Sequence, residues 1–108
     1  MNGPEDRRSE PRAPAGARAV VVAPGLELGC LILDQSPSGL RLRLDRKLAL
    51  PDQVQVVDVA RGLVFDGDVV WRKGQEAGFR QRGQASLRGL VPSRLAAARA
   101  ALLRAGGR

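Results

Sequence analysis

The stretch Leu40-Arg41-Leu42-Arg43-Leu44 alternates strictly between apolar and charged residues. It constrains the fold more than any other part of the chain. Successive side chains of a strand point to opposite faces, so this period predicts a strand with its leucines inside and its arginines outside. Other short runs of valine, leucine and isoleucine are separated by turns that contain glycine or proline, such as Pro24-Gly25. We expect strands over residues 17–23, 26–33, 40–44, 53–60, 63–72 and 76–81, with a bulge near Asp66-Gly67-Asp68 and a turn over 34–39.

Six short strands joined by tight turns predict an all-β fold, namely a small six-stranded antiparallel β-barrel. The ends of the chain differ from this middle part. Residues 1–16 are rich in proline, glycine and charge, which predicts a flexible N-terminal arm. We therefore expect three parts, which are the arm over 1–16, the barrel over 17–82, and a basic linker and helix over 83–108.

The C-terminal part changes to a helical period. A C-terminal α-helix is expected over Arg94 to Arg104, with Ser93 as its N-terminal cap and Gly106-Gly107 as its end. One face of this helix is apolar and is expected to pack on the barrel. It is formed by Val91, Leu95, Ala98 and Leu102.

Composition limits the class of protein. The chain has 108 residues, of which 44% are hydrophobic, and this is enough for one small globular domain. The single cysteine, Cys30, has no partner for an internal disulfide and is expected to be a small buried side chain. We find no apolar run that could cross a bilayer and no signal peptide, so the prediction is a cytoplasmic protein without membrane insertion.

An enzyme is not expected, because the chain has no histidine and therefore no imidazole base. One cysteine without histidine also excludes the common zinc sites, so we expect no metal and no cofactor. The aspartates are scattered over turns and strand ends and are expected to be solvated charges. They are Asp45, Asp52, Asp58, Asp66 and Asp68.

Two short motifs carry the functional signal. Arg8-Ser9-Glu10-Pro11-Arg12, with Arg7 before it, supplies three guanidinium groups, and Asp34-Gln35-Ser36-Pro37-Ser38-Gly39 supplies a carboxylate, hydroxyls and a glycine. Guanidinium groups bind phosphates and the O6/N7 edge of guanine, whereas a carboxylate accepts hydrogen bonds from the guanine N1–H and N2–H₂ donors. Together the motifs suit an anionic guanine nucleotide.

This pair of motifs, in this order, resembles the PilZ domain, a bacterial receptor module for the second messenger cyclic di-GMP. The family pattern is RxxxR before the first strand and [D/N]xSxxG about 20–30 residues later. The stretch over 67–73, followed by Gly78-Phe79-Arg80, is similar to the closing hairpin of the family. Two positions depart from the pattern: Gln81 replaces a phenylalanine, and Pro37 stiffens the turn and removes a donor.

The resemblance implies a role for each motif residue. Arg7, Arg8 and Arg12 would contact phosphates and guanine Hoogsteen edges. Asp34 would accept from a guanine Watson–Crick edge, and Ser36 would bond a guanine or a phosphate. Gly39 would adopt a positive φ and let the nucleotide approach the backbone.

Three further residues are peripheral candidates for the same site: Ser38, Trp71 and Arg72. Trp71 would lie beside the ligand groove or, as the favoured alternative, pack in the core or wall of the barrel.

The function implied is binding of cyclic di-GMP, with the signal relayed by ordering of the N-terminal arm and by contact with a partner protein. A first alternative is a PilZ-like interaction adaptor that does not bind the nucleotide. A second is a small nucleic-acid-binding barrel, suggested by the net charge of +7 and the seven arginines over 80–108. The chain has one tryptophan, two phenylalanines and no tyrosine, which is few stacking side chains for that role.

Overall fold

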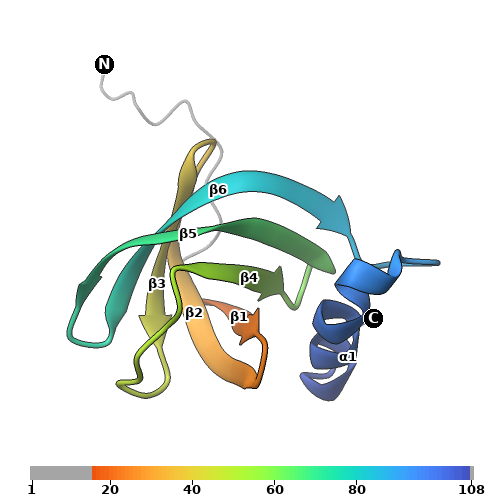
Figure 1. Cartoon of the computed structure of the whole chain (residues 1–108), viewed down its shortest axis with the longest axis horizontal. Helices are drawn as coiled ribbons and strands as arrows, with labels where there is room; N and C mark the ends of the chain where they lie inside the picture. The colour runs from red at the N-terminus through yellow and green to blue at the C-terminus, as the bar shows by residue number, and fades with distance from the viewer. Residues whose placement is uncertain (1–15, 108) are drawn as a thin grey trace.

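The computed structural model describes residues 16–107, which form a closed antiparallel barrel and a C-terminal helix (Figure 1). The predicted fold class is thereby confirmed. Around the barrel the strands follow the order β1-β2-β3-β6-β5-β4. They are β1 (Ala17–Ala23), β2 (Leu26–Ser36), β3 (Gly39–Leu44), β4 (Gln53–Asp58), β5 (Leu63–Lys73) and β6 (Glu76–Ser86).

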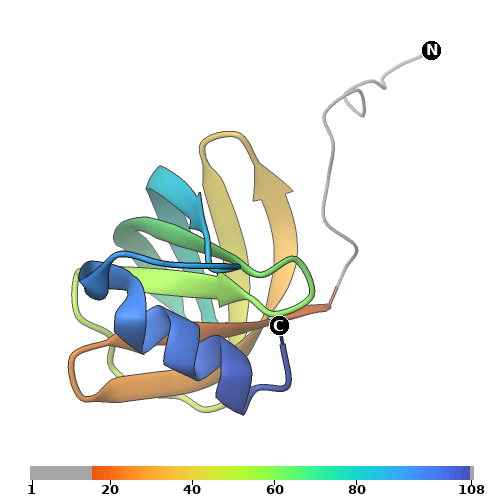
Figure 2. The same ribbon diagram turned by 90° about the vertical axis from the view of Figure 1, so that its right-hand side faces the viewer.

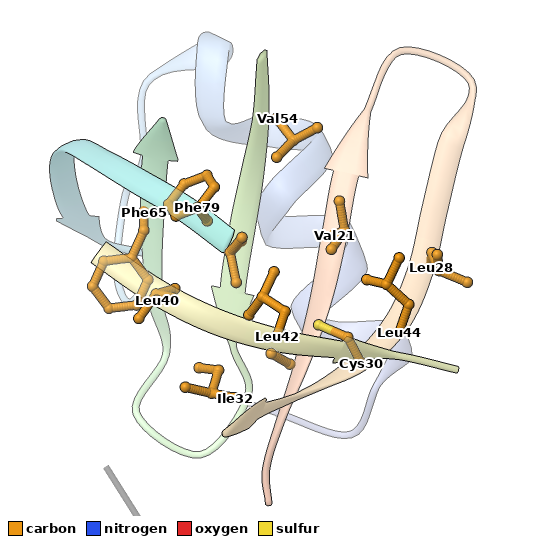
Figure 3. Close-up of a cluster of buried hydrophobic side chains, with 12 residues drawn as sticks. Val21, Leu28, Cys30, Ile32, Leu40, Leu42, Leu44, Val54, Phe65 and Phe79 are labelled. Carbon is orange, nitrogen blue, oxygen red and sulfur yellow. The ribbon is translucent and has the colours of Figure 1, made fainter. Parts of the chain in front are cut away.

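The barrel interior is filled by side chains that alternate along each strand. In β3 the three leucines are buried and Arg41 and Arg43 are exposed, as the alternation predicts. Phe65 and Phe79 add the bulk that valine and leucine lack (Figure 3). The rest of this core comes from smaller buried residues of the first four strands: Ala19, Val21, Leu28, Cys30, Ile32, Leu40, Leu42, Leu44, Val54 and Val56.

A second core lies between the barrel and the C-terminal helix. After the short 3-10 turn η2 (Ser93–Leu95), α1 (Ala96–Arg104) crosses the outer face of β1 and β4 (Figure 2). Leu95, Ala98 and Leu102 are fully buried against outward-facing valines of these strands, which confirms the predicted apolar face.

The helix ends are only partly as predicted. Gly106 has φ of +89° and the Gly107 N–H donates to the carbonyl of Leu102, so the predicted end is confirmed. The predicted Ser93 cap is wrong. Pro92 precedes a 3-10 turn that contains Ser93, and no side chain caps α1.

Arginines of the C-terminal part are exposed but tie the helix to the barrel. Arg104 donates to both carboxylate oxygens of Glu27, at 3.0 and 2.5 Å. This hydrogen bonding lowers the pKa of Glu27. Arg94 pairs with Asp66 at 3.4 Å. Two cations of the basic tail are therefore already matched by acids of the barrel.

Several strand boundaries differ from the sequence expectation. β2 continues to Ser36 and β6 to Ser86, whereas β4 ends at Asp58. The expected turn over 34–39 is shorter, because Gln35 still pairs with Leu40 and Ser36 with Gly39. The predicted bulge is confirmed, since the β5–β6 register shifts between Asp66 and Gly67.

Asp58 is not the solvated charge that was expected. It is only 2% exposed and accepts hydrogen bonds from the Arg61 backbone N–H at 3.1 Å and the Arg61 Nε at 2.7 Å. A buried carboxylate persists when a cation and hydrogen bonds compensate its lost hydration. Here the tight β4–β5 turn brings Arg61 back over Asp58.

Cys30 is only 3% exposed, which confirms the expectation of a small buried side chain and predicts an unreactive thiol. Desolvation, with a smaller contribution from the negative charge of Asp45, raises the pKa of Cys30 to about 12. Almost no thiolate exists near neutral pH, and the thiolate is the reacting form. We expect Cys30 to resist an aromatic disulfide reagent in native protein and to react fully in denaturant. Rapid labelling of native protein would contradict this placement.

Candidate functional site

A groove of about 500 Å³ lies on the outer face of the barrel, beside the β2–β3 hairpin. Its lining comes from β2, β3, β5, β6 and the hairpin turn. In both Figure 1 and Figure 2 this hairpin reaches beyond the other described strands. Five residues singled out in the sequence line the groove together: Asp34, Ser36, Ser38, Gly39 and Trp71.

Local backbone features place the polar groups of the hairpin. A register shift between Ile32 and Asp34 marks a bulge at Leu33, after which β2 pairs with β3 up to the turn. The hydroxyls of Ser36 and Ser38 lie 3.2 Å apart across Pro37. The turn therefore presents two hydroxyl groups to the same groove.

Asp34 has a cationic neighbour on the paired strand. The Arg41 Nη2 lies 3.3 Å from the Asp34 Oδ2, and its Nη1 lies 3.7 Å from the Glu76 Oε1. Nearly half of each side chain of the Asp34–Arg41 pair is exposed, so solvent screens the attraction and both groups stay accessible.

Gly39 is required for a different reason from the one expected. Its φ is not positive, so the predicted left-handed turn conformation is wrong. A Cβ at this position would instead lie 2.2 Å from the backbone carbonyl oxygen of Phe79 on β6. Glycine is needed because β3 and β6 approach too closely here for any side chain.

Trp71 lies on the outer wall of the barrel and lines the groove. The β5–β6 register shifts between Val69 and Trp71, and this bulge leaves Val70 and Trp71 both exposed, at 48% and 42%. The indole covers Gly78, where a Cβ would lie 2.0 Å from the Trp71 Nε1. Trp71 is therefore not in the core; its indole packs on the wall of the barrel at Gly78, where it also lines the groove.

A scan of family models matches the PilZ domain over residues 6–91. The chain belongs to the PilZ domain family. Searches of curated proteins and of solved structures found no significant match. PilZ domains are generally non-catalytic receptor modules, and the family typically binds cyclic di-GMP.

The PilZ match includes sequence motif residues that the structure does not describe. Arg7, Arg8 and Arg12 lie outside residues 16–107. Arg72 is described but does not line the groove. Its guanidinium donates instead to the carbonyl of Leu48 at 2.7 Å and more weakly to that of Gly74 at 3.4 Å.

The groove of this PilZ domain also contains residues that sequence reasoning missed. Arg41, Arg80, Gln35 and Val70 contribute to its lining. Arg80 is exposed, and within residues 16–107 we find no hydrogen bond or ion pair of its side chain. The alternation of β3 places Arg41 outside, but only the β3–β6 register reveals that Arg80 lies opposite Gly39.

The net charge of the groove lining favours an anionic ligand. Its described lining includes two arginines and one aspartate, a formal charge of +1. No group of acidic or cysteine side chains within 16–107 could hold a metal ion. In the same range, no helix is long and apolar enough to cross a membrane.

Replacing Gly78 with alanine should displace the indole of Trp71. A methyl group there would overlap the ring, so the ring must leave the wall and enter solvent. Trp71 is the only tryptophan, and its emission therefore reports this movement alone. We expect a red-shifted emission maximum. Gly83→Ala is the matched control, because a Cβ at Gly83 meets no atom within 4 Å. Equal spectra for both variants would contradict the contact.

Proposed function

We propose that this PilZ domain binds cyclic di-GMP in the groove beside the β2–β3 hairpin. The observation that carries the proposal is the gathering of Asp34, Ser36 and Ser38 around one groove with Trp71 on its other side. The ligand has two guanines and two phosphates, and the groove offers an acceptor, two hydroxyls and an aromatic surface for these parts.

In this proposal, Asp34 accepts hydrogen bonds from the Watson–Crick edge of a guanine, and Ser36 bonds a guanine or a phosphate. Gly39 keeps the backbone of the hairpin accessible to the nucleotide. Ser38 and Trp71 act at the edge of the site, where an exposed indole suits stacking with a base. Arg72 is not part of this proposed site, because its guanidinium is engaged with backbone carbonyls.

Most of the positive charge comes from the RRxxxR motif. Arg7, Arg8 and Arg12 supply bidentate contacts to phosphates and guanine Hoogsteen edges. Arg41 and Arg80 add charge from the barrel. The three motif arginines and the +1 of the described lining together complement the two negative charges of the ligand.

The signal is relayed, in this proposal, when the ligand draws the N-terminal arm onto the groove. The arm leads directly into β1, and β1 contacts α1, so the reorganised surface can present a new face to a partner protein. The paired state of Arg94 and Arg104 does not favour nucleic acid as the partner, because these cations already contact acids of the barrel.

Calorimetric titration of the full chain with cyclic di-GMP tests the proposal, with GTP and a short oligonucleotide as controls. We expect saturable binding of cyclic di-GMP at micromolar concentration or below and none of comparable strength for the controls. An Asp34→Ala variant should bind more weakly. A folded protein that gives no heat with cyclic di-GMP would overturn the proposal and leave the interaction adaptor as the better account.

A further inference from the structure

The outer half of the β2–β3 hairpin has little support from the barrel on its β1 side. β1 begins at Ala17, which pairs with Ile32, so β2 beyond Ile32 has no β1 partner within the described residues. From Asp34 to Ser36 its strand pairing is with β3. β3 is itself paired with β6 here, so β2 is an edge strand from Asp34 to Ser36, and the bulge at Leu33 adds a bend. On the open edge of β2, contacts of its side chains can fix the position of this segment, which forms one side of the groove.

Arg61 reaches across to this segment from the β4–β5 turn. Its Nη2 donates to the side-chain oxygen of Gln35 at 2.6 Å. Gln35 lies between Asp34 and Ser36 and lines the groove, whereas Arg61 does not line it. The Arg61 guanidinium also lies over the ring of Phe65, 5.9 Å from its centroid.

Arg61 is itself held firmly. The buried carboxylate of Asp58 accepts from its backbone N–H and from its Nε, so one end of the side chain is fixed to the barrel wall. Nε and Nη2 lie on different parts of one planar group, and this lets Arg61 bond Asp58 and Gln35 together. Lysine would keep the charge but has a single point-like ammonium group.

We infer that Arg61 is a positioning residue for the groove: anchored by Asp58, it holds Gln35 and thereby the Asp34–Ser36 segment in the geometry that the ligand meets. This inference rests on the proposed function. It assigns a role to a residue of the β4–β5 turn that lies outside both sequence motifs. It also gives the buried carboxylate of Asp58 a role beyond the β4–β5 turn.

The test combines amide hydrogen exchange of the free full-length protein with calorimetric titration by cyclic di-GMP. The variants are Gln35→Ala, Arg61→Lys and the double variant. Gln53→Ala is the matched control, because Gln53 is exposed and does not line the groove. In Gln35→Ala we expect exchange at Asp34–Ser36 to be about 2- to 10-fold faster and the affinity to be about 2- to 10-fold lower. The melting temperature should stay within about 3 °C of the wild type.

The double variant separates positioning from direct contact. If Arg61 acts through Gln35, Arg61→Lys lowers the affinity as Gln35→Ala does, and the two changes together lower it no further. Independent losses that multiply, or an Arg61→Lys affinity equal to that of the wild type, would overturn the inference. So would unchanged exchange at Asp34–Ser36 in Gln35→Ala. If the wild type itself does not bind, the proposed function fails, and the exchange data alone then decide whether Arg61 positions the segment.

Discussion

Replacing Gly39 with alanine should destabilise the domain by about 1–3 kcal/mol and weaken the binding of cyclic di-GMP. The new methyl group would lie 2.2 Å from the carbonyl oxygen of Phe79, and backbone cannot move aside as a flexible side chain can. β3 and β6 must therefore separate where they form the floor of the groove. Urea denaturation measures the first effect, and calorimetric titration measures the second.

Gly83→Ala is the control for the general cost of an added methyl group. Gly83 also lies in β6, its φ is not positive, and its added Cβ would meet no atom within 4 Å. Its free energy of unfolding should equal that of the wild type or slightly exceed it, because alanine restricts the unfolded chain. If Gly39→Ala were as stable as Gly83→Ala, the close approach of β3 and β6 would be contradicted.

Replacing Arg8 and Arg12 together with alanine should lower the affinity for cyclic di-GMP by at least about 100-fold. Hydrogen bonds to charged groups each contribute about 1.5–3 kcal/mol, and the proposal gives both residues such bonds to the ligand. The change should appear as near-complete loss of binding heat at concentrations that saturate the wild type.

An Arg43→Ala/Arg46→Ala variant removes the same amount of charge from exposed positions that do not line the groove. It should retain most of the affinity, since solvent and salt screen distant charges. Equal losses in the two double variants would mean that the arginines act only through the net charge of the protein, and direct contact by Arg8 and Arg12 would be wrong.

The barrel could be predicted from the sequence because its dominant signals are local. The leucines and arginines of residues 40–44 alternate with the period of a strand, and that alternation holds in β3. Leu95, Ala98 and Leu102 have helical spacing and are buried where the C-terminal helix packs on the barrel. In both cases one face of an element must be buried, and the spacing alone identifies that face.

Features that depend on pairing between distant segments were not predictable in the same way. Aspartate is common in turns, which suggests a turn at Asp34. The hydrogen-bonded pairing of β2 with β3 instead continues past the bulge and extends the strand to Ser36. The need for glycine at position 39 comes from the Phe79 carbonyl, forty residues away in the chain. A positive φ is the usual reason for glycine in a turn, so the sequence pointed to the right residue for the wrong cause.

The surroundings of charged residues could not be predicted from the sequence either. Asp58 resembles any aspartate at a strand end, and its burial depends on the return of Arg61 over it. Arg80 enters the groove because its register partner on β3 is Gly39. Neither partner can be found from periodicity, because periodicity fixes the face of a residue and not its neighbour on the next strand.

The central claim is that cyclic di-GMP binds in the groove beside the β2–β3 hairpin. Amide chemical shifts of ¹⁵N-labelled full-length protein, followed during titration with cyclic di-GMP, test it most directly. We predict saturable changes at residues 7–12, at Asp34 to Arg41 and around Trp71 and Gly78, and little change at surface positions far from the groove such as Gln53. Absence of saturable changes, or changes confined to residues that do not line the groove, would contradict the account.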